Sequence, residues 1–122
     1  MTRNTEQRSA IREAIEAAQR PLSVPELLAA ARSTVPTLGQ ATVYRVIRKG
    51  LAERWLEQID LPGEPARYES AGKHHHHHFH CRSCGRMFEV PGCRLADTGP
   101  LPEGFRVEGH EMLLHGTCND CA

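Results

Sequence analysis

The first fifty residues place apolar side chains at the spacing of amphipathic helices. Between residues 5 and 19, apolar positions recur every three or four residues, and a proline then ends the segment. Ser23 and Glu26 have the spacing of a capping box ahead of a second short helix. A third apolar stripe over residues 38–49 stops before Gly50, a residue type that commonly follows a helix end. The pattern therefore predicts three short helices.

The apolar period changes to that of β-strands after residue 51. Residues 52–59 and 67–70 flank a turn rich in proline and glycine at residues 60–65, which predicts a β-hairpin. Three short helices followed by a hairpin are the order of a winged helix-turn-helix domain, whose third helix enters the major groove of DNA.

The second half of the chain is expected to be rich in strands. Strand candidates lie near residues 77–81, 86–90 and 104–117. Residues 91–103, with several prolines and glycines, do not match a long helix. Gly72 and Lys73 form a candidate hinge, so we expect two domains that cover residues 1–72 and 73–122.

The charges divide in the same way. The 122 residues carry 15 Lys and Arg against 15 Asp and Glu, but residues 1–50 hold eight of the basic and four of the acidic side chains. A basic first half suits the phosphates of nucleic acid, and an acidic second half suits cations. No apolar run approaches the ~20 residues that span a bilayer, and no signal-peptide pattern is present. We therefore expect a cytoplasmic protein with no membrane partner.

All five cysteines lie in the second half, and four of them form two Cys-x-x-Cys pairs. Cys81 and Cys84 make the first pair, and Cys118 and Cys121 make the second. In a reducing compartment, four soft thiolates indicate a closed, structural Zn²⁺ site rather than disulfides. Redox-active pairs and plain buried cysteines are the alternatives, although neither pair lies at the strand-to-helix junction of a βαβ unit. The fifth cysteine, Cys93, is unassigned and has the character of a small buried hydrophobe.

A tract of histidines precedes the first cysteine pair, over residues 74–78 and again at His80. Its internal position argues against an expression tag. Because side chains alternate along a strand, odd-numbered and even-numbered histidines would face opposite sides. The tract could thus supply two separate metal centres, and the alternative is a solvated polar strand that binds metals adventitiously.

Three segments make a specific combination: Ala41-Thr-Val-Tyr-Arg45, the His-x-His tract that ends in Cys81-x-x-Cys84-Gly85, and the distal Cys118-x-x-Cys121. Together they closely resemble the ferric-uptake-regulator (Fur) family of bacterial metal-responsive repressors. The resemblance implies an α+β fold, with an N-terminal winged helix-turn-helix domain followed by a small α/β dimerisation domain that holds a four-cysteine zinc site. It also implies a homodimer that binds an AT-rich inverted repeat in double-stranded DNA when its regulatory metal is loaded.

The resemblance further implies three metal sites. The structural zinc site falls on Cys81, Cys84, Cys118 and Cys121. The regulatory site, between the domains, takes Glu69, His76, His78 and Glu89. An additional site takes His75, His77 and His110, with Asp97 as a candidate fourth ligand. This assignment leaves His80 and His115 without a role.

Two departures from the family pattern concern these sites. The segment before the second helix lacks the regulatory histidine that the family often places there, and the hinge lacks the cysteine that some zinc-sensing members use. Glu57 and Asp60 are the candidate replacements. The carboxylate expected in the dimerisation-domain helix falls on Ala96, so Asp97 or the unassigned Cys93 would replace it.

The predicted third helix presents polar and basic side chains opposite its apolar stripe. Tyr44 and Arg45 are candidates for contacts with bases and phosphates, and Arg3 for the minor groove. The alternatives are packing of Tyr44 against the hairpin and, for the basic residues, a solvated last turn that suits the helix dipole. The candidate DNA-binding residues are Arg3, Arg8, Thr42, Tyr44, Arg45, Arg48 and Lys49.

These observations predict a metal-dependent transcriptional repressor rather than an enzyme. The histidine tract favours zinc-sensing control of metal-uptake genes, and an iron, manganese or peroxide sensor of the same family is the alternative. A zinc storage or delivery protein would need the tract but not the basic helix. A zinc hydrolase would need an open coordination position and a general base, and the sequence has no His-Glu-x-x-His spacing. The expected cofactors are structural Zn²⁺ and regulatory Zn²⁺, Fe²⁺ or Mn²⁺, with no small organic substrate.

Overall fold

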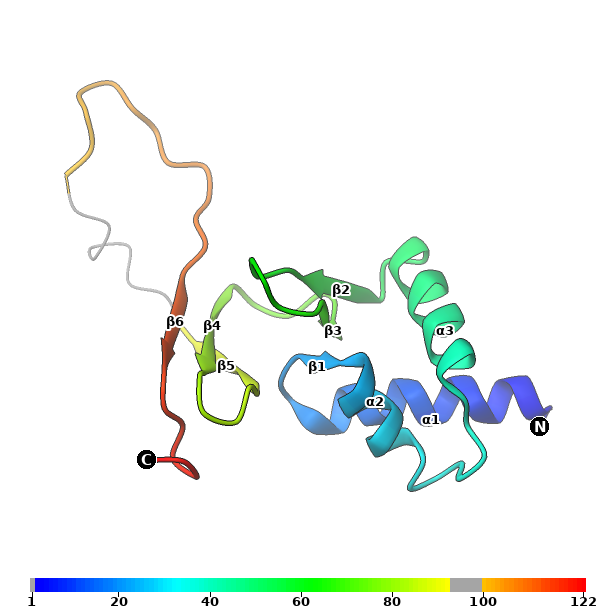
Figure 1. The fold of residues 1–122 in the computed structure, drawn as a ribbon. Coiled ribbons are helices and arrows are strands. Elements are labelled where there is room, and N and C mark those ends of the chain that lie inside the picture. Colours follow the sequence, from blue (N-terminus) through cyan, green and yellow to red (C-terminus); the bar gives the residue numbers. More distant parts are fainter. Residues whose placement is uncertain (1, 93–99) are drawn as a thin grey trace. The chain divides into compact units, whose positions relative to one another are not determined.

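The computed structural model describes residues 2–92 and 100–122 of the chain (Figure 1). It divides into two compact units, Met1–Lys73 and His74–Ala122. Within the described residues, every helix is too short or too polar to cross a membrane.

Three helices build the first unit: α1 (Arg3–Ala18), α2 (Val24–Ala31) and α3 (Gln40–Ala52). The prediction of three helices is confirmed, and so is the capping box before α2. The Ser23 hydroxyl accepts a hydrogen bond from the backbone N–H of Glu26 at 3.4 Å, and Glu26 Oε1 accepts one from the backbone N–H of Ser23 at 3.1 Å. Arg20 adds an ion pair to Glu26, with 2.6 Å between Nη2 and Oε2. The two capping bonds satisfy the N–H groups of Ser23 and Glu26 at the start of α2.

The third helix is longer than expected, because Gly50 lies inside α3 rather than after its end. A Cβ atom at Gly50 would lie 2.9 Å from Cζ2 of the Trp55 ring and 3.2 Å from Cβ of Leu56. The glycine is therefore required by the close approach of Trp55. The prediction that Gly50 ends the helix is wrong for this reason.

The first unit also contains a three-stranded antiparallel sheet of β1 (Leu22–Ser23), β2 (Leu56–Ile59) and β3 (Arg67–Ser70), in the order β1-β3-β2. The predicted hairpin is confirmed as β2 and β3. β1 was not predicted, because a strand of two residues has no period that the sequence could reveal. Three helices followed by this hairpin are the expected order of a winged helix-turn-helix.

One apolar cluster joins the helices and the sheet of the first unit. Each helix contributes side chains that are almost completely buried, and so do β1, β2 and β3. The cluster consists of Ile11, Ile15, Leu22, Val24, Leu27, Ala31, Leu38, Val43, Ile47, Leu56 and Tyr68. The first unit thus has a hydrophobic core of its own.

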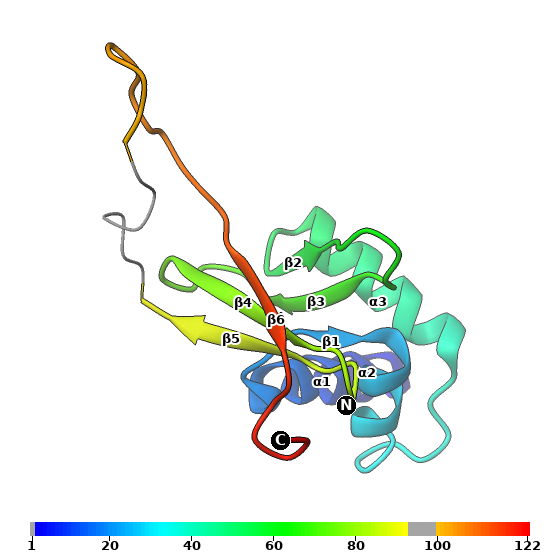
Figure 2. The same cartoon turned by 60° about the vertical axis from the view of Figure 1, so that its left-hand side comes forward.

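The second unit contains a sheet of β4 (His76–Cys81), β5 (Met87–Pro91) and β6 (Leu113–Gly116). β4 lies in the middle, antiparallel to β5 and parallel to β6 (Figure 2). The first two predicted strands are confirmed, whereas the third is confined to four residues of the expected 104–117. Helices in one unit and sheets in both confirm the α+β class, and the described part of the second unit contributes strands alone.

The described part of the second unit buries few apolar side chains. Its buried residues are Cys81, Met87, Cys118 and the imidazole of His77. By contrast, Phe105 is 70% exposed, and Leu113 and Leu114 on β6 are about 40% exposed. The described residues of this unit therefore form no apolar core comparable with that of the first.

Candidate metal centres and nucleic-acid interface

The two cysteine pairs meet at one end of the second sheet. β4 ends at Cys81, and its parallel neighbour β6 ends at Gly116, which is the register partner of Cys81. The Sγ atoms of Cys81, Cys84, Cys118 and Cys121 consequently all lie within 4.8 Å of one another. Four sulfur donors at this spacing can hold a metal ion in a closed tetrahedral site.

Backbone N–H groups and a tight turn position the sulfurs of this four-cysteine centre. Cys81 Sγ accepts hydrogen bonds from the backbone N–H groups of Cys84 at 3.4 Å and of Cys118 at 3.3 Å. Gly85 has a φ of +80°, which glycine adopts without strain, and its N–H donates to the carbonyl of Cys81 at 2.9 Å. The turn after β4 and the segment after β6 therefore each direct one backbone N–H group at Cys81 Sγ.

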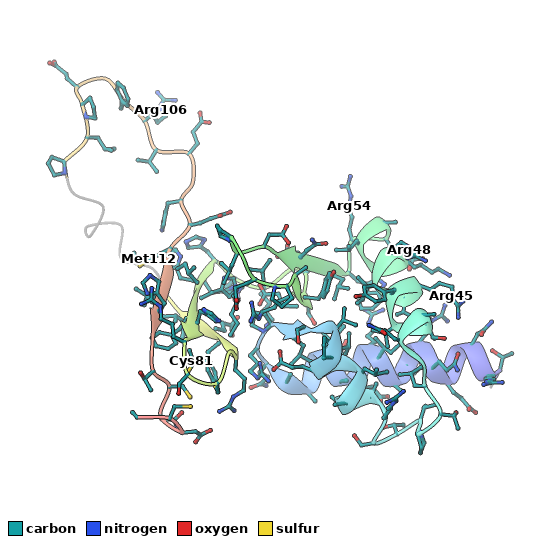
Figure 3. All side chains as sticks on the ribbon, viewed as in Figure 1. Arg45, Arg48, Arg54, Cys81, Arg106 and Met112 are labelled. Atoms are coloured by element: carbon teal, nitrogen blue, oxygen red, sulfur yellow. The ribbon has the colours of Figure 1, made fainter. Side chains whose placement is uncertain are left out.

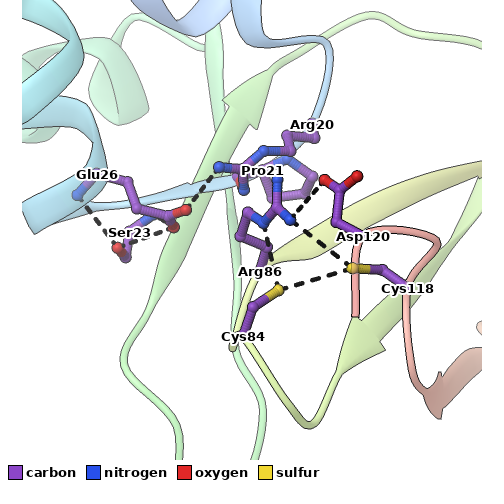
Figure 4. A network of polar contacts seen from close by, with 8 residues as sticks. All are labelled: Arg20, Pro21, Ser23, Glu26, Cys84, Arg86, Cys118 and Asp120. Atoms are coloured by element: carbon purple, nitrogen blue, oxygen red, sulfur yellow. Dashed lines mark hydrogen bonds and ion pairs between the residues drawn. The ribbon is translucent and has the colours of Figure 1, made fainter. Parts of the chain in front are cut away.

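Arg86 places a positive charge against the same sulfurs (Figure 4). Its Nε donates to Cys84 Sγ at 3.2 Å, and its Nη2 lies 3.7 Å from Cys118 Sγ. The same Nη2 donates to Asp120 Oδ2 at 3.0 Å. The guanidinium therefore contacts residues of both cysteine pairs.

These contacts give the four thiols different acidities. The N–H groups of Cys84 and then Cys118 lower the pKa of Cys81 to about 6, and the Arg86 side chain lowers the pKa of Cys84. The pKa of Cys121 is raised to about 12, first by its hydrogen bond with the Cys118 thiol and then by burial. A cysteine binds metal as the thiolate, and a cation at this centre would favour the ionised form of all four thiols.

A second group of donors consists of three imidazoles. His110 Nε2 lies 3.3 Å from Nε2 of His75 and 3.2 Å from Nε2 of His77. Burial and then the neighbouring His75 lower the pKa of His77, which favours the neutral imidazole that a metal ligand requires. Asp97, the candidate fourth ligand of this site, lies outside the described residues, as do Ala96 and Cys93.

A third group lies on the other face of β4. His76 Nδ1 is 3.5 Å from Glu89 Oε1, the rings of His76 and His78 are 4.8 Å apart, and His78 is the register partner of Glu89. Glu69 belongs to β3 of the first unit, where it is buried with Lys73 Nζ 3.9 Å from its carboxylate. Its participation in this group therefore stays a prediction, and so does a role for Glu57 or for Asp60, which accepts a hydrogen bond from Gln58 at 2.9 Å.

The basic side chains of α3 lie on its exposed face, and Figure 3 shows Arg45 and Arg48 projecting from the helix. Lys49 is also exposed, and Tyr44 is 41% exposed. Arg45 Nη2 donates to the hydroxyl of the half-buried Thr42 at 3.1 Å. Arg3 and Arg8 are exposed on α1. The helix thus offers an exposed basic face, which suits contact with DNA phosphates.

Comparison with known proteins identifies the family. The model of the ferric uptake regulator family matches residues 1–115 of the chain. The chain belongs to the ferric uptake regulator family. Members of this family are metal-responsive transcriptional regulators rather than enzymes, so the hydrolase alternative loses its support.

Individual relatives sharpen this result. The ferric uptake regulation protein of Campylobacter jejuni is 33% identical over 87 residues, which cover 69% of this chain but 55% of that protein, so the chain spans about half the length of that relative. The zinc uptake regulation protein of Mycobacterium tuberculosis is 31% identical over 122 residues, 98% of this chain and 94% of that protein. A solved structure of a zinc-bound manganese uptake regulator has a TM-score of 0.79 at 24% identity and covers 97% of this chain and 89% of that chain, which shows a shared fold.

Sequence reasoning missed one contributor to the metal centres of this Fur-family chain, Arg86. Its basic character was visible, but a second arginine, Arg82, lies between the two cysteines of the first pair, and its side chain is instead 3.5 Å from His115 Nε2. Only the structure distinguishes the two arginines. His80 and His115 are register partners in β4 and β6, and the donor groups described above do not include them.

Proposed function

We propose that the chain is a zinc-responsive repressor that binds DNA as a homodimer and controls metal-uptake genes. One observation carries the proposal: a basic, exposed α3 face and three separate groups of Cys, His and Glu donors occur in the same small chain. The 31% identity to a zinc uptake regulation protein over nearly the whole length supports zinc as the effector. The Irving–Williams order also favours Zn²⁺ over Fe²⁺ and Mn²⁺ at donors of this kind.

The four-cysteine centre would hold the structural zinc. Its four soft ligands leave no open position, so this ion would stabilise the second unit rather than sense supply. The same ion is the expected source of stability for a unit with little apolar core.

The regulatory ion would be bound by Glu69, His76, His78 and Glu89. Because Glu69 belongs to the first unit and the others belong to the second, an ion shared by them would fix the angle between the units. Only a fixed angle lets two copies of α3 match two DNA half-sites, which couples metal affinity and DNA affinity reciprocally. His75, His77 and His110, with Asp97, would form the additional site.

DNA contact would run through α3 and the start of α1. Tyr44 and Arg45 would approach the bases and nearby phosphates, and the remaining basic side chains would bind phosphate. The residues of this interface are Arg3, Arg8, Thr42, Tyr44, Arg45, Arg48 and Lys49. Dimerisation would use the exposed edge strand β6, where Leu113 and Leu114 present apolar surface.

A DNA-binding titration tests this proposal. Protein that holds only its structural zinc is titrated against a labelled AT-rich palindrome with added Zn²⁺, Fe²⁺ or Mn²⁺, at constant ionic strength. We expect Zn²⁺ to increase affinity about 5- to 150-fold, the effect of an allosteric coupling free energy of about 1–3 kcal/mol. A metal effect no larger than that of matched salt would contradict metal-gated binding.

Paired variants separate the regulator from a zinc storage protein. The double substitution Tyr44→Ala and Arg45→Ala should abolish specific binding, whereas Arg106→Ala, which removes an exposed arginine of the second unit, should not. Unchanged DNA binding in the double variant would favour storage or delivery.

The carboxylates in the regulatory group favour a second candidate, an iron or manganese sensor of the same family. Glu69 and Glu89 are harder ligands than imidazole and suit Fe²⁺ or Mn²⁺. A larger gain in DNA affinity with Fe²⁺ or Mn²⁺ than with Zn²⁺ in the same titration would select it.

A further inference from the structure

Arg86 is the one described side chain other than the cysteines that contacts a sulfur from each cysteine pair (Figure 4). It follows the first pair in the chain and reaches Cys84 through Nε and Cys118 through Nη2. Asp120, between the two cysteines of the second pair, accepts a hydrogen bond from the same Nη2 at 3.0 Å. The guanidinium also lies over the ring of Phe88, 5.4 Å from its centroid. Two anchors therefore hold this cation against the sulfurs.

The charge of a four-thiolate centre explains why a cation at Arg86 would be favourable there. Four thiolates around one Zn²⁺ leave a net charge of roughly −2. Cys81 and Cys118 are buried, and a buried charge is unfavourable unless an opposite charge or hydrogen bonds compensate for it. Arg86 supplies one positive charge and two N–H donors at this place. Arg82, although adjacent to Cys81, lies by His115 instead.

The four sulfurs differ in the hydrogen-bond donors and positive charge around them. Cys81 Sγ accepts two backbone N–H groups, while Cys84 Sγ and Cys118 Sγ face Arg86. Within the described residues, Cys121 Sγ has neither a backbone N–H nor a cation as donor, and the neutral hydroxyl of Ser83 is its neighbour. A hydrogen bond to a thiolate withdraws electron density from the sulfur, so an unsupported thiolate is the strongest nucleophile of the four.

We propose that Arg86 is a positioning residue that compensates the charge of the four-cysteine centre, slows the loss of its zinc, and leaves Cys121 as the ligand that reacts first. This inference rests on the proposed structural zinc. Electrophiles would enter at Cys121: with iodoacetamide, a C–S bond forms at its sulfur, the C–I bond breaks and iodide leaves. The thioether is a poor zinc ligand, so the ion is then released from the remaining three thiolates.

Zinc release kinetics test the proposal on the full-length zinc-loaded chain. A chromogenic chelator reports release, and mass spectrometry of peptides after brief iodoacetamide treatment identifies the alkylated cysteine. Removal of a residue that supports a metal ligand typically weakens metal binding about 10- to 100-fold. We therefore expect Arg86→Gln to release zinc at least about tenfold faster than the unaltered chain, with alkylation spreading from Cys121 to Cys84.

Arg82→Gln is the matched control, because it removes the same charge from the same turn without a sulfur contact, and it should keep the original rate. Arg86→Lys retains the positive charge and should release zinc almost as slowly as the unaltered chain. A purely steric role of Arg86 would not predict this result. In the Co²⁺-substituted chain, Arg86→Gln should also shift the sulfur-to-cobalt absorption band, since that band depends on electron density at sulfur. Should Arg86→Gln fail to fold with zinc, Asp120→Asn, which frees the guanidinium without removing it, is expected to release zinc severalfold faster.

Two results would overturn the inference. The first is an equal rate of zinc release in Arg86→Gln and Arg82→Gln, which would show that Arg86 does not slow zinc loss. If Arg86→Gln does not fold with zinc, an equal rate in Asp120→Asn and the unaltered chain would show the same. The second is alkylation of Cys84 before Cys121 in the unaltered chain, which would contradict the proposed order of reactivity. By contrast, an unaltered chain that binds no zinc at its four cysteines would contradict the proposed function itself.

Discussion

The two units of this chain are stabilised in different ways. In the first, three helices and a small sheet bury a continuous apolar cluster, and the charged side chains remain largely at its surface. In the second, the described buried residues are Cys81, Met87, Cys118 and His77, and three of these four belong to groups that could hold a metal ion. A unit of about fifty residues without a core usually needs a metal or a partner chain to fold. The contrast predicts that metal supply controls the second unit and leaves the first intact.

The largest expected effect follows from zinc removal. A structural zinc ion contributes an apparent ~10–16 kcal/mol to small zinc domains, more than the second unit can supply by burial. Chelation should therefore abolish amide hydrogen-exchange protection in β4, β5 and β6 and leave that of α1, α2 and α3 unchanged. Cys81→Ser should reproduce this pattern without chelator. Retained protection in β4 and β6 after complete zinc loss would show that the two units do not differ as described.

The next largest effect should follow from creating a cavity in the apolar core of the first unit. Leu27 has no exposed surface, and Leu27→Ala should lower the free energy of unfolding by about 2–5 kcal/mol, the range for a cavity of this kind. Trp55, the single tryptophan of the chain, lies in the first unit and reports its denaturation by fluorescence. Leu28→Ala, the same change at a half-buried neighbour, should have a smaller effect. Faster zinc release in Leu27→Ala would contradict the independence of the units.

A smaller effect is expected at the contact between Gly50 and Trp55. Because a Cβ at position 50 would lie 2.9 Å from the indole, Gly50→Ala should lower the free energy of unfolding by about 1–3 kcal/mol, as overpacking does. Gly39→Ala is the control, since nothing lies within 4 Å of a Cβ there. Urea denaturation followed by Trp55 fluorescence measures both, and an equal effect of the two substitutions would contradict the packing explanation.

The smallest predicted effect concerns the capping box and its dependence on pH. Burial acts to raise the pKa of Glu26, but the hydrogen bonds from Arg20 and from the Ser23 N–H outweigh it, so the pKa lies below its ordinary value (Figure 4). A lowered folded-state pKa stabilises the fold above the unfolded pKa, near 4.5, and that stability is lost as pH falls through the folded value. Glu26→Gln should therefore cost about 1 kcal/mol at pH 7 and progressively less below pH about 4.5. Ser23→Ala should cost a similar amount, and denaturation curves across this pH range measure both.

Local patterns explain what the sequence could predict. The helices follow from apolar spacing, and the capping box follows from Ser23 and Glu26 alone, because both patterns lie within a few residues. The two cysteine pairs likewise predict that four sulfurs converge, although not the parallel pairing of β4 and β6 that brings them together. The division of the histidine tract between two groups follows from the alternation of side chains along a strand.

What the sequence could not predict depends on contacts between distant residues. β6 is a strand only where it pairs with β4, so the long candidate over 104–117 is reduced to Leu113–Gly116. Gly50 resembles a helix end until the position of Trp55 is known. Arg82 and Arg86 are both within two residues of Cys84 in the sequence, and only the contact of Arg86 with the second cysteine pair, more than thirty residues later, distinguishes them.

The parallel pairing of β4 and β6 affects which insertions the chain can accept during evolution. Both strands end at the cysteine centre, so a zinc ion bound there would close the chain between Cys84 and Cys118 as a ring, whatever the length of that ring. The entropy of ring closure grows only slowly, by about 0.6 kcal/mol for each doubling of length. Insertions between β5 and β6 should therefore be tolerated so long as both cysteine pairs survive, and this connection is the place where lineages can diverge in length without losing the fold.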